Sequence, residues 1–182
     1  MVRAEDAAEA YQFALDRACP AVGAALAAVF LLDGAAEVMR PVAAHAWPER
    51  WRPWLGEMRV RVGFGPAGEA AAERRLIEVD DVFADPALED WQEVARELGF
   101  RAIVSLPIEG PEGVAGAVSF YFASEGRAPN AAKSLMRAVA DLLAGIQELD
   151  RLRRRLRLAE AALEDERSAP APRTGDSEAT PA

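Results

Sequence analysis

Two residue types that commonly bind metals or act as nucleophiles occur once each in this sequence. His45 is the only histidine, and strand alternation places it on the same face as Ala43 and Trp47. A haem or metal ligand here would need an apolar pocket and supporting hydrogen bonds, so a half-buried strand histidine is the favoured interpretation. Cys19 cannot form an internal disulfide or a thiolate metal site by itself. We expect it to be a small buried apolar side chain.

Acidic side chains gather in the sequence near Trp91, where paired carboxylates could act as general acid and base. These acids are Glu78, Asp80, Asp81 and Asp85. The sequence supplies no companion nucleophile and no metal-ligand cluster beside them. We therefore predict that the protein has no catalytic residues and no metal site.

A glycine-rich turn contains Gly63, Gly65 and Gly68 with the spacing Gly-x-Gly-x-x-Gly. In dinucleotide-binding proteins this spacing follows a parallel strand and opens a βαβ unit. Here Pro66 lies inside the turn, and the neighbouring strands are predicted to be antiparallel. We therefore interpret the turn as a structural one that frames a pocket, in preference to a phosphate site.

Aromatic side chains are the main indication of a pocket, because Trp and Tyr combine a flat apolar face with one polar atom. Polar groups on or beside the central strands could orient a ligand there. The candidate ligand-binding residues are Trp47, Phe64, Phe83, Trp91, Arg101, Ser105 and Tyr121. The alternative is that the aromatic rings only fill the space between a sheet and a helix.

A central hairpin is expected to position these residues. Residues 102–108 and 114–123 are apolar runs joined by a Gly/Pro turn, which is typical of an antiparallel pair. In the second run, one face is expected to carry Val114, Val118, Phe120 and Phe122, and the other Ala115, Ala117, Ser119 and Tyr121. Because both faces are apolar or small, we expect the hairpin to be covered on both sides.

Further strands are predicted at residues 24–32, 37–47, 58–62 and 76–82. Helices are predicted at residues 4–19, 69–74, 88–98 and 130–167, and residues 48–57 are expected to form a short helical turn or an aromatic loop. Pro20 is expected to close the first helix and Gly99 to cap the helix at 88–98.

The last helix carries an apolar seam with spacings of three and four residues. The seam begins with Leu135, Val139 and Leu142, and its first half is expected to pack on the domain while its second half pairs with another chain. The residues predicted to dimerise are Leu142, Ile146, Leu149, Leu152, Leu156 and Leu163. Acids bracket the basic cluster at 151–157, so a solvated coiled-coil face is favoured over a phosphate- or lipid-binding stripe. We divide the chain into a domain at 1–148, a coiled-coil extension at 149–167 and a disordered tail at 168–182.

The composition excludes several classes of partner. The net charge of −9 and the pI near 4.8 argue against general nucleic-acid binding, which needs a clustered basic surface. The longest strongly apolar run, at 22–32, is too short to span a bilayer, and the first residues lack a signal-peptide pattern. We expect a cytoplasmic protein with no membrane insertion.

Several motifs, in this order, resemble those of the GAF domain, a small-molecule sensing domain related to PAS domains. The segment at 29–34 resembles the family's first strand and turn, the segment at 62–86 its glycine turn, helix and strand, and the segments at 98–108 and 113–122 its central strands. The resemblance covers residues 4–148. It implies an α+β sandwich: a central antiparallel sheet with the N- and C-terminal helices on one face, and loops and short helices over a pocket on the other.

The resemblance also implies a function. It indicates a non-enzymatic sensory or regulatory module that binds a small molecule, forms a homodimer through its terminal helices and signals to a separate protein. It identifies no cofactor. The alternative is a structural or adaptor protein of the same fold whose pocket is filled by its own aromatic rings.

Three specialised classes of the family have motifs from which this sequence departs. Family members that reduce methionine sulfoxide use several cysteines, and members that attach bilins use one beside the pocket. This sequence has only Cys19, at the end of the first predicted helix. The Asn-Lys-Phe-Asp-Glu signature of the cyclic-nucleotide-binding members is absent.

Overall fold

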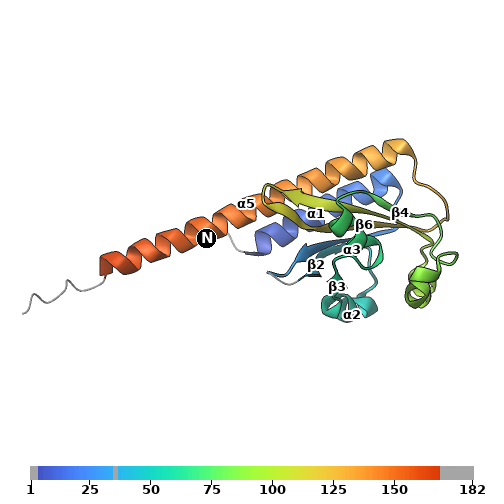
Figure 1. Ribbon diagram of the computed structural model, residues 1–182, viewed down its shortest axis with the longest axis horizontal. Helices are drawn as coiled ribbons and strands as arrows, with labels where there is room; N and C mark the ends of the chain where they lie inside the picture. The colour runs from blue at the N-terminus through green and yellow to red at the C-terminus, as the bar shows by residue number, and fades with distance from the viewer. Residues whose placement is uncertain (1–3, 35–36, 169–182) are drawn as a thin grey trace, which may run out of the picture. The chain divides into compact units, whose positions relative to one another are not determined.

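A six-stranded antiparallel sheet forms the centre of the computed structural model, which describes residues 4–34 and 37–168 (Figure 1). The strand order is β3-β2-β1-β6-β5-β4, and every neighbouring pair is antiparallel. The strands are β1 (Leu26–Leu32), β2 (Val38–His45), β3 (Val60–Arg61), β4 (Ile77–Val79), β5 (Ala102–Gly110) and β6 (Gly113–Phe122). The predicted hairpin of β5 and β6 is confirmed and lies inside the sheet.

The chain divides into two compact units, residues 1–150 and residues 151–182. Five α-helices are described: α1 (Ala4–Val22), α2 (Arg52–Glu57), α3 (Gly65–Glu73), α4 (Gln92–Leu98) and α5 (Asn130–Ser168). Two 3-10 helices, η1 (Glu49–Trp51) and η2 (Pro86–Trp91), precede α2 and α4. In the second unit the described residues 151–168 are helical, and residues 169–182 of the predicted tail lie outside the described residues. Within the described chain, no helix combines the length and apolar character that crossing a membrane requires.

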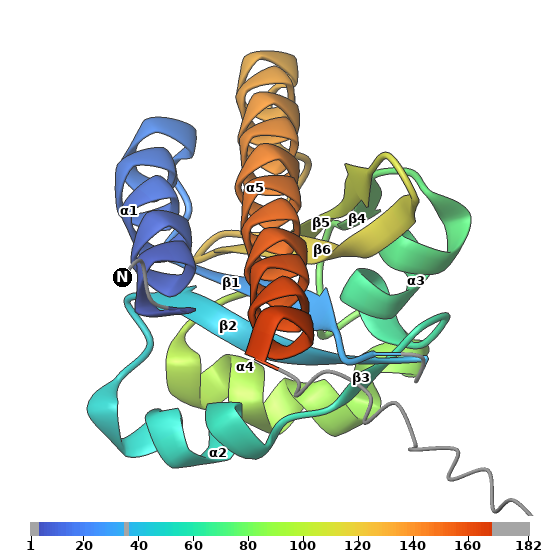
Figure 2. The same ribbon diagram turned by 90° about the vertical axis from the view of Figure 1, so that its left-hand side faces the viewer.

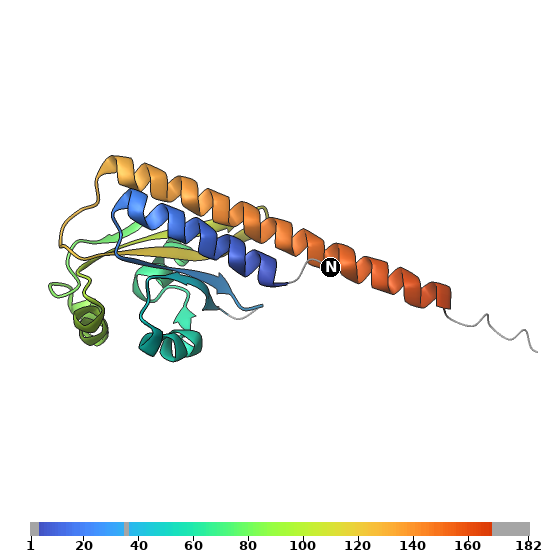
Figure 3. The same cartoon turned by 180° about the vertical axis from the view of Figure 1, so that it is seen from behind.

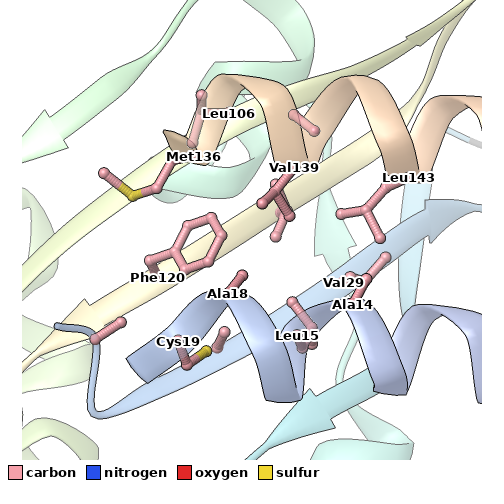
Figure 4. Close-up of a cluster of buried hydrophobic side chains, with 14 of the residues drawn as sticks. Ala14, Leu15, Ala18, Cys19, Val29, Leu106, Phe120, Met136, Val139 and Leu143 are labelled. Atoms are coloured by element: carbon pink, nitrogen blue, oxygen red, sulfur yellow. The ribbon is translucent and has the colours of Figure 1, made fainter. Parts of the chain in front are cut away.

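Helices cover both faces of the sheet within the first unit. On one face, α1 and the part of α5 up to residue 150 lie side by side (Figures 2 and 3). Their core side chains pack with those of the central strands, as Figure 4 shows for Leu15, Val29, Phe120, Met136 and Leu143. On the other face, buried side chains of α2, α3 and α4 pack against the sheet. This arrangement confirms the α+β sandwich with both terminal helices on one face.

The alternation of β6 decides which residues face each layer. Val118 and Phe120 belong to the cluster under α1 and α5, whereas Ala117 and Tyr121 belong to the opposite cluster. Val114 also packs in the opposite cluster, so its predicted grouping with Val118 is wrong. The reason is a register shift between Ile108 and Glu109, which reverses the alternation near the hairpin turn.

The predicted seam of α5 divides into two stripes. Met136, Val139 and Leu143 are buried against the sheet, while Leu135 and Leu142 are 39% and 56% exposed. One residue along a helix turns by about 100°, so stripes displaced by one residue lie on different faces. The first half of the seam therefore does not pack on the domain as one stripe, as was predicted: Val139 does, whereas Leu135 and Leu142 do not.

The first helix continues past its predicted end at Pro20 to Val22. A proline removes only one donor from the helix, and this one occurs within the last turn. The helix ends instead at Gly23, whose φ of 75° is left-handed, and the Ala24 amide donates to the Cys19 carbonyl at 3.0 Å. The predicted helix at 88–98 begins as a 3-10 helix, and Gly99 caps α4 with a φ of 74° as expected.

Candidate functional site

A cleft with a volume of about 270 Å³ opens on the face of the sheet that carries α3; we name it the α3 cleft. Its floor comes from the sheet, and its walls come from residues 58–61, the start of α3 and the end of η2. The lining residues are Phe30, Met58, Arg59, Val60, Arg61, Phe64, Gly65, Pro66, Ala67, Trp91, Ile103, Ser119 and Tyr121. All belong to the first unit.

The glycine-rich turn shapes one wall of the α3 cleft. Gly63 and Gly65 have φ values of 84° and 64°, which favour glycine, and the Gly63 amide donates to the Gly68 carbonyl at 2.8 Å. A Cβ atom on Gly68 would lie 2.2 Å from the Arg61 carbonyl oxygen. The third glycine therefore lets α3 pack directly on the backbone of β3.

The surroundings of this turn differ from those of a dinucleotide site. The strand before it, β3, is a two-residue edge strand that pairs antiparallel with β2. The parallel βαβ unit of a dinucleotide fingerprint would require a parallel strand at this point.

Two buried hydroxyl groups line the floor of the α3 cleft. Ser119 is 1% exposed, and its Oγ atom lies 2.7 Å from Oγ of Ser105 on the neighbouring strand. Tyr121 is 3% exposed. Burial raises the pKa of its phenol well above the usual value, and a hydrogen bond with Ser119 only partly opposes the shift. Tyr121 therefore stays a neutral hydrogen-bonding group across the physiological pH range.

Two arginines lie on the opposite side, at the wall formed by residues 58–61. Arg59 donates through Nη1 to the carbonyl oxygens of Gly56 and Met58, at 3.1 and 2.7 Å. The Arg61 guanidinium lies over the Phe64 ring, 4.8 Å from its centroid. Both are exposed, and neither forms an ion pair with an acidic side chain of the described residues.

The structure brings together three of the predicted ligand-binding residues, Phe64, Trp91 and Tyr121, at the α3 cleft. Ser105 lies behind Ser119 as its hydrogen-bond partner. Trp47 belongs to an aromatic cluster: it stacks on Trp54 at 6.3 Å.

Trp47 also meets Tyr121 edge-on at 5.9 Å and donates to the Ala27 carbonyl at 3.2 Å. Phe83 and Arg101 lie apart from the α3 cleft. Arg101 lies over the Phe83 ring at 5.6 Å and pairs with Asp81 and Glu125 at 2.7 Å each.

Sequence reasoning missed several residues of the α3 cleft, above all Phe30, Arg59 and Arg61. Phe30 was one of many apolar residues in a buried strand, and nothing local to β1 distinguishes it. The two arginines had a usable signal, because they alternate with apolar residues directly before the glycine-rich turn.

A second, more polar groove lies between α1, β2 and α2, with a volume of about 700 Å³. Nδ1 of His45 lies 2.6 Å from Oδ1 of Asp16, which also accepts a 2.8 Å hydrogen bond from Gln12. The hydrogen bond with His45 is the main reason that the pKa of Asp16 is lowered. In residues 4–34 and 37–168, no group of three or more His, Cys, Asp or Glu side chains is placed to hold a metal ion.

Cys19 is a residue of α1 whose side chain belongs to the core between α1 and the sheet (Figure 4), and it is fully buried. Burial, with a smaller contribution from the charge of Asp16, raises the pKa of its thiol to about 12. Almost none of the nucleophilic thiolate is therefore present at neutral pH.

Comparison with known proteins identifies related folds. The family model described as GAF domain matches residues 4–146. No curated protein matches the chain in sequence.

Among solved structures, the GAF domain of a phosphoenolpyruvate-protein phosphotransferase from Coxiella burnetii is similar, with a TM-score of 0.69 and 18% identity over 81% of this chain and 85% of that chain. A GAF domain/HD domain protein from Geobacter sulfurreducens has a TM-score of 0.68 and 16% identity. The match covers 81% of this chain and 95% of that chain. The free methionine-R-sulfoxide reductase from Neisseria meningitidis, solved in complex with its substrate, has a TM-score of 0.65 and 16% identity over 80% of each chain.

Proposed function

The chain belongs to the GAF domain family, and from this premise we propose that it is a non-enzymatic, cytoplasmic sensory or regulatory module. In this proposal it binds a small molecule in the α3 cleft, forms a homodimer through its terminal helices and acts on a separate signalling protein.

The α3 cleft is the observation that carries the proposal. Ligand sites are mostly apolar concavities with a few convergent polar groups. The α3 cleft combines apolar side chains such as Phe30 and Ile103 with the hydroxyl groups of Ser119 and Tyr121. Its volume of about 270 Å³ suits a small metabolite.

Strand β6 offers a direct route from the α3 cleft to the terminal helices. Ser119 and Tyr121 line the cleft, while the intervening Phe120 packs in the cluster that contains Met136 and Leu143 of α5. A ligand that favours one position of β6 would thus favour one packing of α5. In this mechanism the signal is the shift of α5 from one packing arrangement to another.

The absence of catalysis is supported by the state of Cys19. The methionine-R-sulfoxide reductases from Neisseria meningitidis and Thermoplasma acidophilum are structural neighbours at 16% and 13% identity, a level that indicates the fold alone. Thiol-based reduction needs a thiolate attacker and a second thiol to resolve the intermediate. This chain has one cysteine, and it is buried with a raised pKa.

The dimer is supported by leucines that repeat every seven residues along α5. Leu135, Leu142 and Leu149 in the first unit are all exposed, and Leu156 and Leu163 continue the spacing in the second unit, where both are exposed. A seven-residue apolar repeat is the signature of a coiled coil. Leu152, which is 48% exposed, takes the intermediate position between Leu149 and Leu156. Ile146 differs from the other predicted dimer residues, because it packs partly against the core of its own domain.

Native mass spectrometry and an absorbance spectrum of freshly purified full-length chain test ligand binding. A co-purified small molecule supports the sensor. A clean apo mass, with no thermal shift across a metabolite panel, would instead support the alternative adaptor with a self-filled pocket.

Light scattering after size exclusion tests the dimer with two matched variants. Leu156→Glu is expected to shift the chain to a monomer, because it places a charge in the seven-residue repeat. Leu158 is 71% exposed but lies outside the repeat, so Leu158→Glu should leave the dimer intact. A monomeric wild type, or equal behaviour of the two variants, would contradict the proposed interface.

A further inference from the structure

The charge of the α3 cleft is opposite to that of the whole chain. The chain carries a net charge of −9, yet the charged residues that line the cleft are Arg59 and Arg61. Elsewhere in the domain several arginines pair with carboxylates, such as Arg101 with Asp81 at 2.7 Å and Arg127 with Asp80 at 3.2 Å. The two cleft arginines have no such partner among the described residues, so their charge is available to a ligand.

The remaining polar groups of the α3 cleft also suit an anion. Ser119 and Tyr121 are neutral hydrogen-bonding groups at its floor, so neither adds a negative charge that would repel one. Residues 65–67, the first turn of α3, line the wall, and Phe64 at the N-cap provides no side-chain hydrogen bond to that turn. The backbone amides at a helix start carry partial positive charge, which adds to the field of the arginines.

The body of the α3 cleft is apolar and flat-sided. Phe30, Ile103 and Trp91 line it together with the ring of Tyr121. Such surfaces favour a compact ring or branched hydrocarbon over a hydrated polar body. A planar carboxylate matches a guanidinium, which can donate two parallel hydrogen bonds to it.

We propose that the α3 cleft is selective for a small organic carboxylate with an apolar ring, whose carboxylate is held by Arg59 and Arg61. This inference rests on the proposed function, because it assigns a ligand class to the same cleft. It adds a specific requirement: the ligand must carry negative charge at the arginine wall.

Titration calorimetry of the full-length chain at low ionic strength tests the charge requirement with isosteric probes. Benzoate and benzamide share size and shape and differ in charge, and cyclohexanecarboxylate and its amide form a second pair. Because charge-assisted hydrogen bonds are the stronger class, each carboxylate should bind about tenfold or more tightly than its amide. The preference should weaken as salt is added, since the arginines are exposed.

Two variants test whether Arg59 and Arg61 cause the preference for carboxylates over amides. The double variant Arg59→Gln and Arg61→Gln should bind carboxylate and amide equally, with the affinity for the amide unchanged. Arg50 is also exposed and has no ion pair among the described residues, but it lies outside the cleft, so Arg50→Gln should keep the preference.

The outcomes separate this inference from the proposed function. Equal binding of both members of each pair, combined with loss of both through the cleft-filling Val60→Phe, would overturn the charge requirement while keeping the cleft as a ligand site. Tighter binding of phenyl phosphate than of benzoate would overturn carboxylate selectivity in the same way. A preference that survives in the double variant would also overturn it. Failure of both carboxylates to bind while native mass spectrometry detects a co-purified ligand would refute only the ligand class.

Discussion

Replacing Gly68 by alanine tests whether the glycine-rich turn builds the α3 cleft. The added Cβ would lie 2.2 Å from the Arg61 carbonyl oxygen and 3.3 Å from the Gly63 amide nitrogen. Both atoms are backbone, so no rotamer change relieves the contact, and β3 must move by about 1 Å to restore a normal separation. Because β3 pairs only through two residues at the sheet edge, we expect it to yield without unfolding the domain.

Two opposing effects determine how far Gly68→Ala changes the free energy of unfolding. Overpacking of this kind costs about 1–3 kcal/mol, while the better helix propensity of alanine returns up to about 1 kcal/mol. The difference spans about 0–3 kcal/mol, and the severe 2.2 Å backbone contact argues against the low end. We expect a net loss in the free energy of unfolding of about 1–2 kcal/mol, or roughly 2–8 °C in Tm for a chain of this size. Displacing Arg61 should also weaken the binding of any cleft ligand.

Urea denaturation and thermal scans, with Gly56→Ala as the matched control, measure the effect. A Cβ on Gly56, in helix α2, would meet nothing within 4 Å, so that variant should be neutral or slightly more stable. A Gly68→Ala protein as stable as the wild type, with unchanged ligand binding, would refute the close approach of α3 to β3.

Three further predictions concern the rest of the domain. Cys19 in the folded chain should react with a thiol reagent at pH 8 at least about a hundredfold more slowly than Cys19 in the chain unfolded by guanidinium chloride. The reason is that a pKa of about 12 leaves roughly one thiol in ten thousand ionised. Equal rates would contradict the burial of Cys19. Lys133→Met should lower the free energy of unfolding by about 1–3 kcal/mol in a urea titration, since it removes the ion-pair partner that lies 2.6 Å from the largely buried carboxylate of Glu78. A change near zero would count against this pair. His45 lowers the pKa of Asp16, so the pair should stabilise the fold by less than about 1 kcal/mol at pH 6, and this should disappear as the pH falls through the lowered pKa. Urea titrations of Asp16→Asn and wild type at pH 6 and in acid measure this, and a difference that grows in acid would reverse the expected sign.

Much of the fold could be predicted because its signals are local. The apolar runs of β5 and β6 and the Gly/Pro turn between them specify a hairpin over a short stretch of chain. Gly99 marks the end of α4, because a left-handed cap favours glycine. At 48–57 the sequence predicted a short helical turn or an aromatic loop, and the structure shows the first of these alternatives, η1 followed by α2.

The predictions that the structure contradicts concern segments in which two sequence signals compete. The last helix carries enough apolar residues for two stripes, and spacing alone does not show that Met136 and Leu143 pack inward while Leu142 stays exposed. At Val114 the period-two rule failed, because β6 contains one extra residue, Ala115, where Ile108 pairs with Gly116 and Glu109 with Val114.

By itself, the sequence determined the order of helices and strands, the central hairpin and the place of the glycine-rich turn, because neighbouring residues fix these features. Only the tertiary structure decided which side chains share the α3 cleft. Phe30, Trp91 and Tyr121 are far apart in the chain and meet because β1 pairs with β6 and η2 closes over that face. Strand order and register depend on the packing of the whole domain, so the two arginines that give the cleft its charge acquire their importance only in the folded protein.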